Sequence, residues 1–149
     1  MDEKLQAVVT SVNTFLNETN LTAMVEAVAE RLVSFGFAPT TDDAWMIAFS
    51  IQKSTNHIFN QTNQSKVPEG LFEVAVDMIC GELLNAKFLS GTLKLDELDL
   101  DGIVESVNQG DTTVAFNVEG SDEAKLKALL SWLMQGKGCD LLCYRKMRW

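Results

Sequence analysis

The stretch that decides the fold is Val67-Pro-Glu-Gly-Leu-Phe-Glu-Val-Ala-Val-Asp-Met-Ile-Cys-Gly-Glu-Leu-Leu-Asn-Ala86. Its apolar residues recur with the 3.6-residue period of a helix, and no other stripe in the chain is as clear. Pro68 suits a first helical turn, where a missing amide proton removes no hydrogen bond. We therefore predict a central core helix that ends near Gly91. Its core-facing stripe is Leu71, Val74, Ala75, Met78, Ile79, Glu82, Leu83 and Ala86.

Weaker patterns of the same period predict helices on both sides of this stretch. The first seventeen residues or so form one amphipathic pattern, and residues 22–35 form a second that Gly36 is placed to end. Thr40 and Asp43 have the spacing of a capping box, which opens a third helix that continues through Ile58. A last helix opens at Ser121 and runs to Gly136.

Between these helices the periodicity changes from helical to alternating. Residues 113–118 alternate apolar and polar side chains, and Gln109-Gly-Asp111 supplies turn residues before them. Residues 103–107 would be the partner strand. The predicted fold class is mainly α: a bundle of about four to five helices, with a small β-hairpin at about residues 103–118 inserted before the last helix. Residues 1–136 form one domain, and residues 137–149 an extended C-terminal tail.

Charge divides the 149-residue chain in the same way. The tail has four basic residues against one acidic residue, about +3, which leaves about −12 on residues 1–136 from a net charge of −9. An acidic body argues against a protein that wraps nucleic acid. No apolar run approaches the roughly 20 residues of a membrane span, and the N-terminus lacks the features of a signal peptide. We expect a cytosolic protein without a membrane partner.

Residues for catalysis are sparse. His57 is the sole histidine, and it lies in a helical pattern where a plain surface or half-buried position is the simpler interpretation. Cys80 lies inside an apolar helical pattern, where packing in the core is the simpler interpretation. Cys139 and Cys143 have a spacing compatible with two zinc ligands, but no further ligands are evident. We predict no enzyme, no catalytic residue, no metal and no cofactor.

Two acidic patterns bear on metal binding. Residues 97–108 resemble a calcium loop at three places, but Glu97 and Asn108 stand at positions where that loop needs Asp and Glu. A solvated acidic loop is the simpler interpretation. Glu26 and Glu30 have helical spacing, and together with carboxylates of the fourth helix they keep a metal-dependent hydrolase open as a minor alternative.

The tail contains the residue types that concentrate binding energy at protein interfaces. Tyr144 and Trp149 bring area, and Arg145 and Arg148 bring planar donor groups. The two glycines Gly136 and Gly138 precede them, so the tail could reach away from the body. The alternative is a terminal segment whose Leu141, Leu142 and Trp149 pack back onto their own domain. The sequence leaves both open.

Four short motifs in a fixed order resemble a known family. They are Ile58-Phe-Asn60, Val67-Pro-Glu-Gly-Leu71, Gln109-Gly-Asp-Thr-Thr-Val-Ala-Phe116 and Leu142-Cys-Tyr-Arg-Lys-Met-Arg-Trp149. In this order they resemble the small head-to-tail connector or adaptor proteins of tailed bacteriophages and prophages of Gram-positive bacteria. The resemblance runs from about Thr41 to the end.

The resemblance implies a virion structural protein, present in the host cytoplasm during assembly. It implies self-association into a ring, commonly a dodecamer, beneath the portal protein, where the ring extends the DNA channel and receives the next tail completion protein. Genomic DNA would pass through without specific binding, and an acidic lining would repel its phosphates. The expected contact surfaces are residues 93–118 and the partner-binding residues Tyr144, Arg145, Lys146, Arg148 and Trp149. The alternative is a small cytoplasmic helical regulator or inhibitor that binds one protein partner.

Overall fold

The computed structural model describes residues 3–16, 21–93, 98, 122–135, 141 and 143–147. Within these ranges it contains five α-helices and two short 3-10 turns, and no strand. The prediction of a mainly α-helical fold is thereby confirmed. The predicted hairpin at residues 103–118 lies outside the described residues, so the described part of the chain lends it no support. The elements, in chain order, are α1 Glu3–Phe15, α2 Thr22–Ser34, η2 Thr41–Asp43, α3 Ala44–Thr62, η3 Glu69–Leu71, α4 Phe72–Leu89 and α6 Asp122–Gln135.

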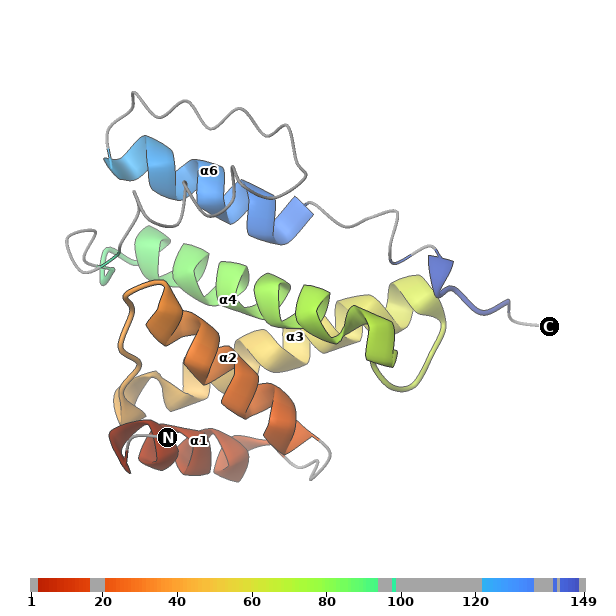
Figure 1. Cartoon of the computed structure of the whole chain (residues 1–149), viewed down its shortest axis with the longest axis horizontal. Coiled ribbons are helices and arrows are strands. Elements are labelled where there is room, and N and C mark those ends of the chain that lie inside the picture. The colour runs from red at the N-terminus through yellow and green to blue at the C-terminus, as the bar shows by residue number, and fades with distance from the viewer. Residues whose placement is uncertain are drawn as a thin grey trace.

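Helix α4 is the centre of the packing, as its stripe predicts. It packs against α2, α3 and α6, while α1 closes the other side of α2 and α3 (Figure 1). Ile79, Cys80, Leu83 and Leu84 of α4 are fully buried. Helix α6 contributes Leu126, Leu129, Leu130 and Leu133 to the same core. Burying a side chain of this size stabilises the fold by about 1.5–3 kcal/mol, so α4 and its neighbours supply much of the driving force.

Local signals set where the helices begin and end. The capping box is present: the Thr40 backbone amide donates to the Asp43 carboxylate, which also lies 3.3 Å from the Thr40 hydroxyl. Gly36 follows α2 with a φ of 89°, a conformation in which a Cβ would be strained. Asn63 ends α3 in the left-handed region, with a φ of 54°. Asparagine tolerates this region better than most residues.

Helices α3 and α4 form an antiparallel pair, joined by residues 63–71, which we call the α3–α4 turn. The far end of the pair, where α3 begins and α4 ends, is closed by an ion pair between Lys87 Nζ and Asp43 Oδ1 at 2.7 Å. The turn itself is where the C-terminal residues of the described chain lie (Figure 1). The two ends of one helix pair are thus held by different parts of the sequence.

Candidate functional site

The described C-terminal residues 143–147, which we call the C-terminal segment, lie against the α3–α4 turn. The backbone amide of Lys146 donates to the Thr62 carbonyl at 2.7 Å. The Asn63 side-chain amide donates to the Lys146 carbonyl at 2.9 Å, and the Gln64 side-chain amide donates to the Tyr144 carbonyl. These bonds join residues eighty or more positions apart, and each of them uses a main-chain carbonyl as its acceptor.

Gly70 lets the ring of Tyr144 approach the turn. A Cβ at Gly70 would lie 1.9 Å from the Tyr144 hydroxyl oxygen and 2.7 Å from its Cζ, so no residue with a side chain fits beneath that ring unmoved. Leu141, just before the segment, is buried at 6% exposure. The chain therefore packs back onto its own domain at Leu141, as the second of the two alternatives expects for that residue, while Leu142 and Trp149 lie outside the described residues.

The side chains of the segment remain exposed although its backbone is held. Arg145, Lys146 and Met147 are all exposed, Met147 at 72%. The backbone of this segment is bonded to Thr62, the last residue of α3, and the C-terminal end of a helix carries partial negative charge that favours nearby cations. Arg148 and Trp149, the other two predicted partner-binding residues, lie outside the described residues. Arg145, Lys146 and Met147 thus form an exposed strip that is cationic and partly apolar.

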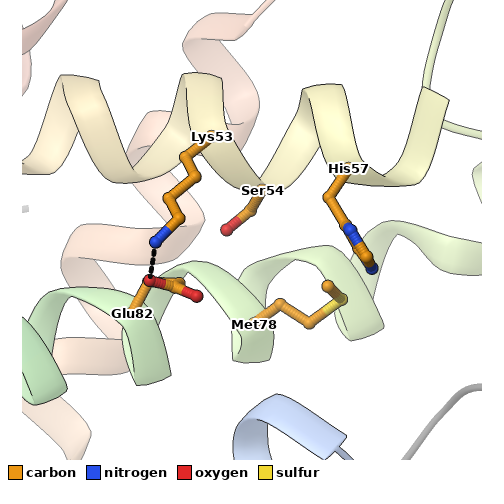
Figure 2. Close-up of a pocket in the computed structure, with 5 residues that line it drawn as sticks. All are labelled: Lys53, Ser54, His57, Met78 and Glu82. Atoms are coloured by element: carbon orange, nitrogen blue, oxygen red, sulfur yellow. Dashed lines mark hydrogen bonds and ion pairs between the residues drawn. The ribbon is translucent and has the colours of Figure 1, made fainter. Parts of the chain in front are cut away.

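A second feature is a cavity of about 210 Å³ between α3 and α4. Figure 2 shows its lining: Lys53, Ser54 and His57 from α3 face Met78 and Glu82 from α4. Lys53 Nζ and Glu82 Oε2 form an ion pair at 3.0 Å. Ser54 is only 2% exposed, and its hydroxyl has no hydrogen-bond partner among the described residues. The sequence singled out His57 and Glu82 but gave no reason to join them to Ser54.

Aromatic side chains form a third feature, on the outer face of α3. Trp45 and Phe49 are 59% and 51% exposed, and their rings stack with centroids 5.5 Å apart. Exposed aromatic pairs of this kind are more common at protein interfaces than on inert surfaces. Periodicity predicts Trp45 as part of the α3 helix pattern, but it does not reveal that the ring faces outward.

Two of the carboxylates considered for metal binding, Asp77 and Glu82, form ion pairs with basic side chains. Glu30, Glu73 and Asp77 line one cavity of about 490 Å³ between α2 and α4, but Arg31 lines it too and pairs with Asp77 at 3.1 Å. Glu26 does not line that cavity. Over the described ranges no three His, Cys, Asp or Glu side chains are grouped in a way that could hold a metal ion. The hydrolase alternative therefore receives no support from these residues.

The buried cysteine of α4, Cys80, is poorly placed to act as a nucleophile. Cys80 is buried in the core, and burial, with Asp77 nearby, raises the pKa of its thiol far above the ordinary value. A thiol held in this protonated form is a poor nucleophile. Cys143 is exposed on the C-terminal segment, and Cys139 lies outside the described residues.

Comparisons with known proteins give no match: no family model, no curated protein and no solved structure is similar to this chain. Over the residues that the structure describes, none of the helices is both long and apolar enough to cross a membrane.

Proposed function

We propose that this protein is a non-enzymatic structural subunit of the head-to-tail junction of a tailed bacteriophage or prophage. In this proposal it assembles as a ring under the portal, extends the DNA channel and receives the next tail component. The order of sequence motifs from Thr41 onward motivates the proposal.

One observation carries the proposal: the C-terminal segment is ordered by its backbone while its side chains stay exposed. Three hydrogen bonds fix residues 144 and 146 against residues 62–64. Arg145, Lys146 and Met147 consequently project from the molecule without being needed for its core. A segment ordered in advance loses less conformational entropy on binding than a free tail does, which strengthens association.

The proposal also assigns two surfaces that the structure does not describe. Residues 93–118, with the predicted hairpin, would form a second contact surface in the ring. Arg148 and Trp149 would extend the contact made by Tyr144, Arg145 and Lys146. The acidic body, at about −12 over residues 1–136, would face the channel and let DNA slide.

The decisive experiment mixes the protein with the portal protein of the same phage and examines the products by light scattering and negative-stain electron microscopy. The expected result is a portal-dependent ring, lost when residues 137–149 are deleted. The double variant Arg145→Ser/Lys146→Ser should weaken assembly at least about tenfold, because it removes exposed charges at the contact. Lys66→Ser is the matched control, since Lys66 is also an exposed lysine of the α3–α4 turn.

A protein that stays monomeric or dimeric beside a portal able to assemble would overturn the connector proposal. In that case the helical regulator becomes the favoured function, with the stacked Trp45 and Phe49 as the contact surface. It predicts a defined complex with one partner that Trp45→Ser weakens and deletion of residues 137–149 does not.

A further inference from the structure

The cavity between α3 and α4 has a feature that helix packing alone does not explain. Hydroxyls inside helices usually return to a carbonyl of the preceding turn. Thr55 Oγ1 donates to the Ile51 carbonyl at 2.8 Å, and Thr62 Oγ1 donates to the Ile58 carbonyl at 2.7 Å. Ser54, on the same helix and equally buried, makes no such bond. A buried hydroxyl without a partner is costly, and such groups call for an explanation.

The Ser54 hydroxyl points from α3 toward α4, into the space between Glu82 and Met78 (Figure 2). The ion pair to Lys53 uses the Oε2 atom of Glu82, and the other carboxylate oxygen points into the same space. Met78 forms an apolar wall. A hydroxyl that can donate or accept therefore faces a carboxylate oxygen that can only accept.

The charges that line the cavity select the kind of ligand. Lys53 and Glu82 neutralise each other at 3.0 Å. An anion entering beside Glu82 would be repelled by its carboxylate, and a cation would be repelled by the Lys53 ammonium. A neutral group that both donates and accepts meets neither cost. The volume of about 210 Å³ also exceeds the roughly 10–15 Å³ that a cavity needs in this measure to hold one water molecule.

We propose that this cavity is a binding site for a primary carboxamide, in which the ligand NH₂ donates to Glu82 and its carbonyl accepts from Ser54. The short alkyl part of the ligand would pack on Met78. This inference is independent of the connector proposal. The carboxamide could belong to an Asn or Gln side chain of another protein or to a free small molecule, and both offer the same chemistry.

The test uses three planar molecules of nearly the same shape that differ in charge: propionamide, propionate and propionamidinium. Each is titrated into the full-length protein while the ring protons of His57 are followed by NMR. His57 is the sole histidine and lines the cavity, so its signals identify themselves. We expect saturable binding of propionamide with a Kd on the order of 10 mM, as small ligands allow. Both charged molecules should bind at least about fivefold more weakly.

Two variants separate a ligand-binding hydroxyl from a structural one. Ser54→Ala should weaken propionamide binding at least about tenfold, and the Tm should stay level or rise because an unpartnered buried hydroxyl is removed. Thr55→Val is the matched control. It removes a neighbouring hydroxyl that is hydrogen-bonded within its helix, so the Tm should fall while binding is retained.

Each remaining outcome contradicts the proposal. It is overturned if no saturable shift of His57 appears, if either charged molecule binds as tightly as propionamide, or if Ser54→Ala binds like the parent protein. Comparing free glutamine with N-acetyl-glutamine methylamide then distinguishes the sources. Tighter binding of the capped residue indicates a side chain of a partner protein, and tighter binding of the free amino acid indicates a small molecule.

Discussion

The two ends of the α3–α4 pair are fixed by different physical means. At the far end, Lys87 bonds Asp43, with side chains only 12% and 13% exposed, and its ammonium lies 5.1 Å from the centre of the Phe37 ring. At the α3–α4 turn, main-chain and side-chain amides hold a segment eighty or more residues away along the chain. The far end is therefore stabilised by a buried ion pair within the helical body. The α3–α4 turn is stabilised by close packing of the C-terminal segment.

The largest loss of stability is expected from a substitution at the far end of the α3–α4 pair, where Asp43 and Lys87 meet. Asp43→Ala removes both the acceptor of Lys87 and half of the capping box, and leaves a mostly buried ammonium without its partner. The loss of stability should be about 3 kcal/mol, measured by urea denaturation. Asp42→Ala, an exposed neighbour in the same turn, should change stability by less than about 0.5 kcal/mol. A loss below about 1 kcal/mol for Asp43→Ala would mean that this end is not held by the ion pair.

At the α3–α4 turn, we expect the free energy of unfolding to depend on the fit of the Tyr144 ring over Gly70 and not on charge. Gly70→Ala places a Cβ where the Tyr144 ring lies, so the segment must move away, at a cost of about 1–2 kcal/mol. Faster amide hydrogen exchange at Lys146 would report the release directly. In a Tyr144→Ala background the same substitution should become neutral or stabilising, because the contact is gone and alanine lowers the entropy of the unfolded chain. An unchanged cost in that background would contradict the role assigned to Gly70.

The smallest change in stability is expected for an exposed ion pair, which serves as a comparison for the buried pair of Asp43 and Lys87. Lys53→Met breaks the ion pair with Glu82, but the Lys53 side chain is 56% exposed and water screens the pair. We expect a loss below about 0.5 kcal/mol that disappears in 1 M salt. The Asp43–Lys87 pair, tested by Asp43→Ala in the same buffers, should keep most of its effect at high salt. Equal salt dependence of the two pairs would contradict the difference in burial on which the comparison depends.

The far end could be predicted from the sequence because its signals are local. Thr40 and Asp43 are three residues apart, and Gly36 follows the apolar pattern of α2 directly, so spacing alone marks the helix ends. Periodicity in the same way predicts the burial of half of the α4 stripe: Leu71, Ala75, Ile79 and Leu83. The other predicted stripe residues are only half-buried, Val74, Met78, Glu82 and Ala86, and Val76, Cys80 and Leu84 are buried instead. The bonding of Lys87 to Asp43, across 44 positions, has no such signal.

The contacts of the turn and of the cavity could not be predicted, for two physical reasons. The segment is held partly through the backbone of Thr62, Tyr144 and Lys146, and main-chain groups are the same at every residue. Gly70 reads as part of a helix start, although the ring above it also requires a glycine. In the sequence Ser54 looks like an ordinary small helix residue, and only the packed structure shows that its buried hydroxyl has no hydrogen-bond partner among the described residues.

The bond from the Lys146 amide to the Thr62 carbonyl also has a consequence for folding kinetics. The chain between these residues forms a long loop, and closing it has an entropic cost that shorter-range helix contacts avoid. Contacts of such sequence separation tend to form late, after the local helices and their nearest neighbours. Gly70 and the end of α3 should accordingly stay uncovered in a transient species whose helical body is already formed. In refolding followed by pulsed hydrogen exchange, the Lys146 amide should gain protection after the amides of α3 and α4.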